Sequence, residues 1–494
     1  MHLAIFEVKG STRPRQSRPT LWSRVAVVAL AIAPLAVVTG CGNTYRPVVS
    51  AINPVGPASQ PIKYAVVVSN PNHNPNQVVP PPCPGSIPST DKQGLVTLVN
   101  FSGDTVMVTA NVGIDPYYLA LNSAGNEGYT LACDGTVNSF AISPTLMTND
   151  VQQTTLLLGA KPASLFAEGT YTYIAQPGRN SVAELTGIPP ALQQELPASP
   201  GYLPIYTVGV AATPRSYAIT QKNGGGIGEV LAIDNTNATN SPPTITNTIP
   251  VGNDPNYGVM TTDGRRAFIL NQTDGTVSVI NAQTNDLDTF HDPTDPTNTR
   301  ITSTIPVGAS PVWADLATTR AELVVANQGN GVTPGSVSII SIPLCSLVTL
   351  PTNPNCDQAN PVDAVGFGTV LATVPVGVNP IMVTVLGDGT RAYVANAGNP
   401  AMGIAGSVSV VNLVSNAVTA TLTALPDGQC STPTSLAVCG HPVYIASTTG
   451  VPTGKVYVVS KDSNFMSVIN TDIDQPHAIV PIQGSGVSVR MTEP

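Results

Sequence analysis

Thr-Ile-Pro-Val-Gly occupies residues 248–252, and related phrases recur as Ser-Thr-Ile-Pro-Val-Gly at 303–308 and Ala-Thr-Val-Pro-Val-Gly at 372–377. Each copy is followed by a proline, an alternating apolar run, a turn, a second apolar strand and then Gly-(Thr/Ser)-Val-Ser-(Val/Ile). A phrase that returns with the same pattern around it indicates a repeat architecture. The recurrence therefore predicts how the chain is built, and it does not identify a ligand.

The Gly-(Thr/Ser)-Val-Ser element is the most regular part of the repeat, and eight copies can be aligned. They lie at 94–100, 135–140, 180–185, 228–233, 275–280, 335–340, 406–411 and 464–469. Their starts are 41, 45, 48, 47, 60, 71 and 58 residues apart, which gives a period near 45 with insertions in the later repeats. This element is the third strand of its repeat. Together with the strands on either side of the preceding turn and the outer alternating run, it gives four short strands per repeat. That pattern predicts an all-β propeller of eight four-stranded antiparallel blades, with seven blades as the alternative.

The two ends of the chain predict how the ring closes. The first repeat has its second, third and fourth strands at 64–70, 94–100 and 104–110, but it lacks a first strand. The C-terminus has one unassigned strand at 487–491. We expect this strand to complete blade one, because closing the ring removes exposed sheet edges.

Composition agrees with an all-β chain. The 494 residues are 42% hydrophobic and only 10% charged, and they include 47 Pro and 43 Gly. Many β-branched residues between Gly, Pro and Asn indicate short strands joined by turns. Residues 191–196 are the only modest candidate for a helix.

The first 40 residues are typical of a lipoprotein signal peptide. Lys9 and four arginines precede an apolar run at 25–38, which is short for a membrane span. The run ends in Val38-Thr39-Gly40-Cys41, which resembles a bacterial lipobox with Cys41 as the lipidated residue. The alternative is an ordinary signal peptide with an incidental cysteine. We expect a signal peptide at 1–40, a lipidated Pro-rich tether at 41–61 and a single propeller domain at 62–494.

Charge and the residue after Cys41 bear on partners and location. Removing residues 1–40, with five basic residues and Glu7, changes the formal net charge from −9 to −13. An acidic chain with scattered basic residues argues against nucleic acid as a partner. Gly42 in place of Asp resembles the pattern of lipoproteins released to the outer membrane of Gram-negative bacteria. We expect an exported, monomeric protein held at the membrane through Cys41.

Six cysteines remain besides Cys41, an even number that predicts disulfides in an exported protein. In a propeller, the loops between second and third strands share one face with the loops between blades. This placement predicts three disulfides, with free thiols as the alternative: Cys83–Cys133, Cys345–Cys356 and Cys430–Cys439.

An acidic loop in the fifth repeat is a candidate calcium site. Asp286, Asp288, Asp292 and Asp295 lie close in sequence and surround His291. Carboxylate oxygens are the ligands that Ca²⁺ prefers, although the spacing fits no EF-hand. Solvated acidic loops are the alternative, and we expect no other cofactor.

Two stretches carry a family resemblance. "IPVGNDP…TTDGRRAFILNQTDGTVSVIN" at 249–281 and "VPVGVNP…LGDGTRAYVANAG…GSVSVVN" at 374–412 resemble the YVTN-type β-propeller repeats of surface-layer and surface-lipoprotein chains. The resemblance covers about 64–491 and is closest over 248–422. It implies a propeller at the cell surface and no particular reaction.

Catalytic patterns are scarce. After residue 40 the chain has four His and one Trp, and no Gly-x-Ser-x-Gly elbow is present. Asn271, Asn327 and Asn396 end second strands, and we interpret them as turn residues rather than as a polar ring at a pocket mouth. We expect a non-catalytic binding or structural module for protein, glycan or cell-wall partners. The alternative is a lactonase-like envelope hydrolase with a metal in the central channel. That alternative requires three or more carboxylate, Asn or His side chains converging from different first strands.

Overall fold

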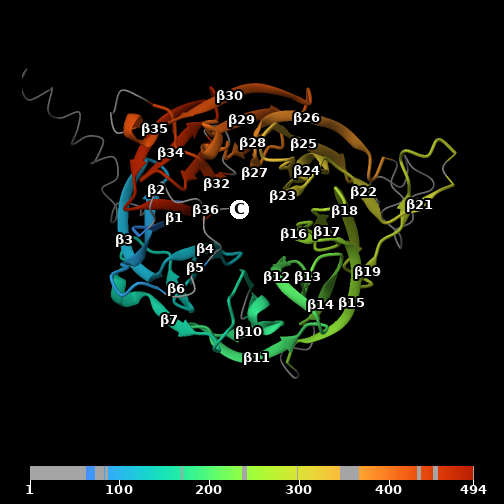
Figure 1. Ribbon diagram of the computed structural model, residues 1–494, viewed down its shortest axis with the longest axis horizontal. Helices are drawn as coiled ribbons and strands as arrows, with labels where there is room; N and C mark the ends of the chain where they lie inside the picture. Colours follow the sequence, from blue (N-terminus) through green and yellow to red (C-terminus); the bar gives the residue numbers. More distant parts are fainter. Residues whose placement is uncertain are drawn as a thin grey trace, which may run out of the picture. The chain divides into compact units, whose positions relative to one another are not determined.

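The computed structural model describes residues 63–72, 83, 87–168, 171–235, 242–297, 299–344, 366–430, 436–448 and 454–492. The chain divides into two units at Ile62/Lys63. The unit from Lys63 to Pro494 is a ring of eight antiparallel sheets (Figure 1). The predicted all-β propeller is confirmed with eight blades, so the seven-bladed alternative is wrong.

The blades follow one another in chain order, and each runs from an inner strand beside the centre to an outer strand. Blades one and two are β36 (Ser485–Met491), β1 (Tyr64–Asn70), β2 (Gln93–Asn100), β3 (Thr105–Ile114); and β4 (Pro116–Leu121), β5 (Glu127–Ala132), β6 (Thr136–Ala141), β7 (Gln152–Thr155). Blades three and four are β8 (Ser164–Glu168), β9 (Tyr171–Gln176), β10 (Ser181–Thr186), β11 (Ala191–Pro197); and β12 (Tyr202–Gly209), β13 (Arg215–Lys222), β14 (Ile227–Asp234), β15 (Thr244–Asn253).

The later blades carry the insertions. Blades five and six are β16 (Pro255–Met260), β17 (Arg266–Asn271), β18 (Thr276–Asn281) with β19 (Asp286–Leu287) and β22 (Thr304–Pro306); and β23 (Pro311–Ala317), β24 (Glu322–Asn327), β25 (Pro334–Ser341), β26 (Val370–Val378). Blades seven and eight are β27 (Pro380–Val385), β28 (Arg391–Asn396), β29 (Ser407–Asn412), β30 (Ala417–Leu425) with β31 (Val438–Cys439); and β32 (Pro442–Ser447), β33 (Lys455–Ser460), β34 (Phe465–Asn470), β35 (Gln475–Pro481).

The remaining elements are short. A hairpin of β20 (Phe290–His291) and β21 (Ile301–Thr302) extends blade five. The helical turns of the described residues are η1 (Thr148–Asp150), η2 (Pro177–Arg179), η3 (Thr318–Arg320), η5 (Pro400–Met402) and α2 (Asp427–Cys430). The modest helix candidate at 191–196 is a strand: these residues form β11, which pairs with β10 from Ser181↔Pro197 to Thr186↔Ala191. Pairing to an existing sheet edge outweighs the weak helical preference of Ala, Leu and Gln.

The C-terminal strand closes the ring as predicted. β36 pairs antiparallel with β1 from Ala65↔Met491 to Asn70↔Ser485, and it is the inner strand of blade one. The backbone N–H of Tyr64 donates to the Thr492 hydroxyl at 3.0 Å. Blade one is therefore built from both ends of the domain.

The glycine of Pro-Val-Gly is required by a close contact with the second strand of the following blade. A Cβ atom on Gly308 would lie 2.7 Å from the Asn327 side chain, and one on Gly377 would lie 2.6 Å from Asn396. Each of these asparagines is buried and donates through Nδ2 to two serine hydroxyls of the next strand, as Asn396 does to Ser407 and Ser409 at 3.1 and 2.9 Å. Asn271, Asn327 and Asn396 are therefore structural. Their side chains link two strands by hydrogen bonds, and they are not left-handed turn residues.

Neighbouring blades are joined through the tyrosine of the second strand. The Tyr217 hydroxyl donates to Oδ1 of Asn285 in the next blade at 2.8 Å. Tyr393 makes the same contact with Asp474, and Arg391 also binds that carboxylate. The Arg-x-Tyr pattern of the second strands thus anchors the outer turn of the following blade.

The hydrophobic core lies between the faces of adjacent blades. One cluster joins Val324 and Val337 of blade six to Val383 and Val394 of blade seven, all at most 1% exposed. Similar clusters follow around the ring, and one joins blade eight to blade one. Because no four-stranded sheet buries both of its faces alone, stacking around the ring supplies the core.

Candidate functional site

The inner strands place one equivalent position from every blade at the centre of the ring. In six blades this residue lies two positions after a proline of the inner strand. Ser164 and Ser488 take the same place in β8 and β36, because each pairs with the second strand in the same register. The eight residues are Ser488, Tyr118, Ser164, Tyr206, Tyr257, Trp313, Met382 and Tyr444.

Four of these aromatic side chains contact one another from different blades. The ring centroids of Tyr206 and Tyr257 are 4.8 Å apart, and those of Tyr257 and Trp313 are 4.2 Å apart. Trp313 and Tyr444 meet edge to face at 5.8 Å, past the intervening seventh blade. The strands that carry them, β12, β16, β23 and β32, all lie beside the centre in Figure 1. Aromatic rings therefore line the channel from blade four to blade six and again at blade eight.

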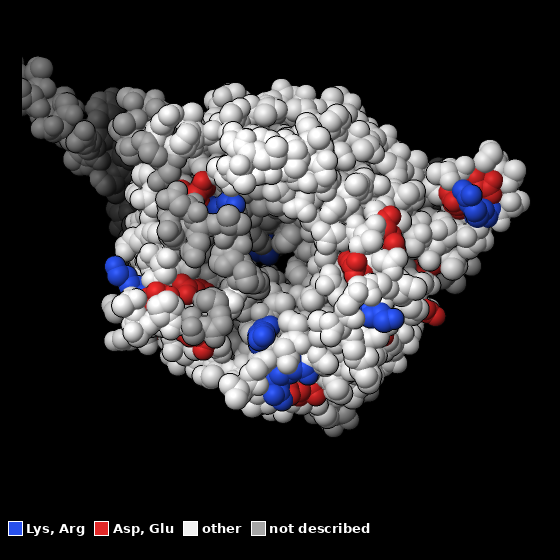
Figure 2. Space-filling model, in the orientation of Figure 1, with Lys and Arg blue, Asp and Glu red and all other residues white. Residues whose placement is uncertain are grey.

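Arg490 of β36 lies beside these rings. Its guanidinium carbon lies 4.8 Å from the ring centroid of Tyr444 and 5.9 Å from that of Trp313. Its Nε atom is buried and has no hydrogen-bond partner among the described residues. The hydroxyls of Tyr444 and Ser488 lie close enough to each other for a hydrogen bond. The space-filling view shows basic side-chain atoms inside the hollow of the ring (Figure 2). The site combines a cation with stacked aromatic rings and hydroxyl groups.

The carboxylate of Asp315 belongs to the same tier of the channel as Arg490, since each lies two residues beyond the central position of its strand. Asp315 accepts hydrogen bonds from the backbone N–H groups of Val385 at 2.7 Å and Leu316 at 2.8 Å. Burial raises the pKa of Asp315 to about 6, although the two N–H groups and Arg490 oppose that shift. Its charge therefore changes close to neutral pH.

Asp315→Asn should stabilise the protein at pH 7.5 and have little effect at pH 4.5. Because the folded-state pKa, about 6, exceeds the ordinary 3.8, the native state binds this proton more tightly than the unfolded state does. The wild-type free energy of unfolding therefore falls as pH rises from about 4 to 6, by up to about 3 kcal/mol. Urea unfolding of both proteins at the two pH values measures the difference. An equal effect at both pH values would contradict the shift.

Burial also keeps the channel tyrosines protonated. It raises the pKa of Tyr444 to about 12, and it raises the pKa values of Tyr206 and Tyr257 as well. These hydroxyls consequently remain neutral hydrogen-bond donors at physiological pH.

The four aspartates of the calcium prediction do not converge. Asp288 forms a buried ion pair with Arg266, and Asp292 pairs with Arg300 at 2.6 Å. Asp295 accepts hydrogen bonds from Thr297 and from the Arg300 backbone, whereas Asp286 accepts one from the Leu287 backbone. The described residues contain no group of three or more His, Cys, Asp or Glu side chains able to hold a metal ion. Protein groups thus already occupy the carboxylates expected to bind calcium.

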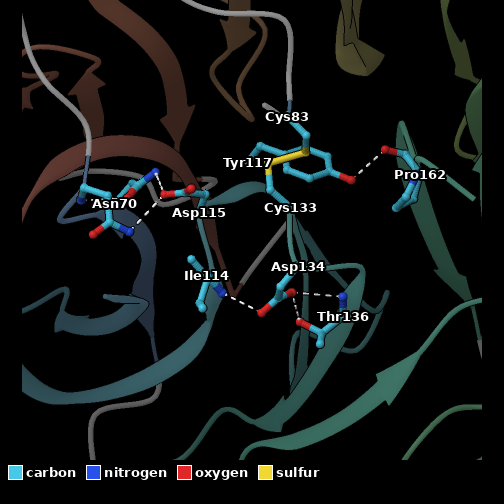
Figure 3. Close-up of a disulfide and its surroundings, with 10 residues drawn as sticks. Asn70, Cys83, Ile114, Asp115, Tyr117, Cys133, Asp134, Thr136 and Pro162 are labelled. Atoms are coloured by element: carbon cyan, nitrogen blue, oxygen red, sulfur yellow. Dashed lines mark hydrogen bonds between the residues drawn. A yellow bond between two sulfur atoms is a disulfide. The ribbon is translucent and has the colours of Figure 1, made fainter. Parts of the chain in front are cut away.

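Two of the predicted disulfides are present. Cys83–Cys133 joins blade one to blade two, and Cys430–Cys439 closes a loop of blade seven. Cys345, Cys356 and the lipidation candidate Cys41 lie outside the described residues. Figure 3 shows other links around the first disulfide: Asn70 donates to Asp115 at 3.0 Å, and the Tyr117 hydroxyl donates to the Pro162 carbonyl at 2.6 Å. This face is therefore fastened across three consecutive blades.

Replacing both Cys83 and Cys133 by Ala should lower the free energy of unfolding by about 4 kcal/mol. The disulfide spans a sequence separation of 50 residues, and the loss follows from the entropy that the unfolded chain regains. Urea unfolding of the variant and the wild type, without reductant, measures it. A loss below about 1 kcal/mol would show that the hydrogen bonds of Figure 3 hold blades one and two together without the disulfide.

Sequence reasoning missed the channel. The signal was present, because the residue two positions after the inner-strand proline is aromatic in Tyr118, Tyr206, Tyr257, Trp313 and Tyr444. Along the chain these residues are indistinguishable from core aromatics, and Arg490 follows no repeat pattern.

Comparisons with known proteins address the fold. No family model matches the chain, and no curated protein matches it. Among solved structures, the dihydro-heme d1 dehydrogenase NirN, solved in complex with DHE, matches with a TM-score of 0.57 and 12% identity over 87% of this chain and 75% of that chain. Apo AztD from Citrobacter koseri matches with a TM-score of 0.51 and 10% identity over 87% of this chain and 97% of that chain.

A putative 6-phosphogluconolactonase from Bacteroides fragilis also matches, with 14% identity over 74% of this chain and 95% of that chain. Its TM-score of 0.46 is too low to bear on function. At these identities the similarities support a shared fold alone. The chain is an eight-bladed β-propeller, and its resemblance to YVTN-type repeats continues to rest on its own sequence.

Proposed function

We propose that this protein is a lipid-anchored β-propeller of the cell envelope, located at the outer membrane, which binds a protein, glycan or cell-wall partner without catalysing a reaction. The lipobox-like sequence ending in Cys41 supports the anchor. The two disulfides support export, since such bonds persist in oxidising compartments. In the described residues, no helix combines the length and apolarity that a membrane span requires.

The lining of the central channel is the observation that carries the binding role. Its described inner strands supply aromatic rings, hydroxyls and one guanidinium. Aromatic rings can stack on a ligand, and the polar groups can form hydrogen bonds with it. Hydrolysis at a metal would instead require several convergent oxygen or nitrogen ligands. Besides Asp315, the described inner strands carry Glu168, which accepts a hydrogen bond from Ser123, and Asn256, which donates one to the Pro311 carbonyl. No histidine side chain lies on these strands. The donor set of the lactonase-like alternative is thus not assembled there.

The binding role is tested by measuring metal content and lactone hydrolysis on the same purified protein. We expect no stoichiometric metal, and we expect hydrolysis of a lactone panel at the uncatalysed rate. Turnover that disappears with a chelator and returns with the metal would overturn the non-catalytic assignment and favour the hydrolase. Turnover without a metal would overturn it as well.

The anchor is tested by labelling cells with a radioactive fatty acid. The wild-type chain should become labelled and fractionate with the outer membrane, whereas Cys41→Ser should remain unlabelled. Gly42→Asp is a matched control, because it keeps the cysteine but places Asp after it. We expect that variant to be labelled and retained at the inner membrane. A labelled Cys41→Ser protein would contradict the assignment of the lipid to Cys41.

A further inference from the structure

We propose that the central channel binds a planar organic anion, an aromatic carboxylate, whose carboxylate pairs with Arg490 and whose ring stacks against Trp313. This inference deepens the proposed binding function and rests on it. It specifies the ligand class and the residues that recognise it.

The first step of the argument is that no carboxylate of the described residues contacts Arg490 directly, although the charge of Asp315 acts on it from a distance. An arginine stays protonated in proteins, and a charge withdrawn from water is normally paired. The structure describes no ion pair or hydrogen bond for Arg490, and its Nε is buried without a partner. Contact with the faces of Tyr444 and Trp313 compensates part of the free energy lost when the guanidinium is removed from water. A guanidinium with a free edge in a partly dry channel matches the two oxygens of a carboxylate.

The second step is the kind of polar group that surrounds this cation. Ser488 lies two residues before Arg490 on the same strand, and its side chain is 2% exposed. A hydrogen bond between Ser488 and Tyr444 partly opposes the rise that burial causes in the pKa of Tyr444. These two neighbours of Arg490 are therefore neutral hydroxyls, which do not balance its charge.

The third step is the shape of the aromatic lining. Tyr206, Tyr257 and Trp313 form a stack, with 4.8 and 4.2 Å between successive ring centroids, and Trp313 at its end is only half-buried. Tyr444 stands nearly perpendicular to Trp313, at 76°, on the side where Arg490 lies. A flat ring gains stacking on such a stack, whereas a compact anion such as phosphate gains only the charge. The aromatic lining therefore favours a planar aromatic anion.

Asp315 should make this binding depend on pH. Arg490 is the cation that faces Asp315, and the hydroxyls of Tyr257 and Tyr444 also lie within reach of its charge. The backbone N–H groups of Val385 and Leu316 donate to its carboxylate. The pKa of Asp315, about 6, means that its carboxylate is largely neutral at pH 5 and ionised at pH 7.5. An ionised Asp315 repels a bound anion and partly neutralises Arg490. Affinity should therefore rise several-fold between pH 7.5 and pH 5.

Tryptophan fluorescence reports directly on the site. The full chain has two Trp residues, and Trp22 lies in the proposed signal peptide, so Trp313 is the sole emitter of the mature protein. The probe is 4-nitrobenzoate, and its uncharged control is 4-nitrobenzamide, which has a similar ring and similar absorbance. We expect saturable quenching by the carboxylate, at least tenfold tighter than any quenching by the amide. Inorganic phosphate, added as a competitor, should displace the probe weakly.

The variants separate recognition from structural support. Arg490→Met should weaken binding of 4-nitrobenzoate at least tenfold, and Arg490→Lys should weaken it less, because one charge remains without the planar fork. Arg320→Met is a matched control, since Arg320 pairs with Glu322 in blade six and should leave binding unchanged. Asp315→Asn should reduce the difference in affinity between pH 5 and pH 7.5 to less than twofold. Circular dichroism checks that each variant is folded.

The outcomes distinguish this inference from the proposed function. Absence of saturable quenching, equal quenching by the amide, or unchanged affinity in folded Arg490→Met would each overturn the ligand assignment. If Arg490→Met fails to fold, Arg490→Lys and the amide control still decide the question. Any of these failures without lactone turnover would leave the non-catalytic role standing. Lactone turnover together with tight 4-nitrobenzoate binding would overturn that role but retain the anion site.

Discussion

A chain that stops at Gly484 should fail to form a stable propeller. The deletion removes β36, and with it the inner strand of blade one and its pairing with β1. Burial of Val489 and Met491 alone contributes about 3–6 kcal/mol, which is comparable to the whole stability of a typical domain, about 5–15 kcal/mol. We expect loss of the cooperative urea transition, and early elution or aggregation in size-exclusion chromatography.

The control for this deletion is a chain that stops at Thr492. It keeps β36 and the hydrogen bond from the Tyr64 backbone to the Thr492 hydroxyl, so its urea midpoint should equal that of the full chain. A synthetic peptide of residues 485–492, added in excess to the shorter chain, should restore part of the transition by adding the missing strand. A cooperative, monomeric chain ending at Gly484 would show that seven complete blades and a three-stranded sheet are sufficient.

Asp288→Asn should cost about 3–5 kcal/mol, because it leaves the Arg266 guanidinium buried without its partner. Arg266 is 0% exposed and Asp288 is 5% exposed, so water cannot replace the lost carboxylate. Burial already lowers the pKa of Arg266, which shows the cost of holding this charge inside blade five. Urea unfolding at pH 7 measures the change.

Asp292→Asn provides the matched comparison in the same region. It removes the same charge from a pair whose arginine, Arg300, is 60% exposed, and we expect a loss below about 1 kcal/mol. Similar losses in the two variants would contradict the view that burial makes the Asp288 pair important. An increase in stability of Asp288→Asn would do so more directly.

Local sequence patterns predicted the blades because propeller strands are local. The alternating run, turn and Gly-Ser-Val-Ser strand of each repeat fall within one blade, so period and turn chemistry were sufficient to place them. The same logic placed Cys83 beside Cys133 and paired Cys430 with Cys439, as the structure confirms.

Other predictions depended on partners that lie elsewhere in the chain. Residues 191–196 resemble a short helix in isolation, yet they pair with β10 as the outer strand β11. Asp288 resembled a calcium ligand beside Asp286 and Asp292, but its partner Arg266 comes from the second strand of the blade. The asparagines that end second strands could be interpreted as structural from the sequence. Only the packing of Gly308 against Asn327 explains why the Pro-Val-Gly phrase ends in glycine.

By itself, the sequence determined that this chain is an all-β ring of repeated four-stranded units, because each unit is specified by residues close together along the chain. Only the tertiary structure decided what lies at the centre. Tyr206, Trp313 and Arg490 come from blades four, six and one, and they meet only because the ring closes. Blade architecture is a local property of the repeats, whereas the channel is a convergence of their inner strands, which no single repeat specifies.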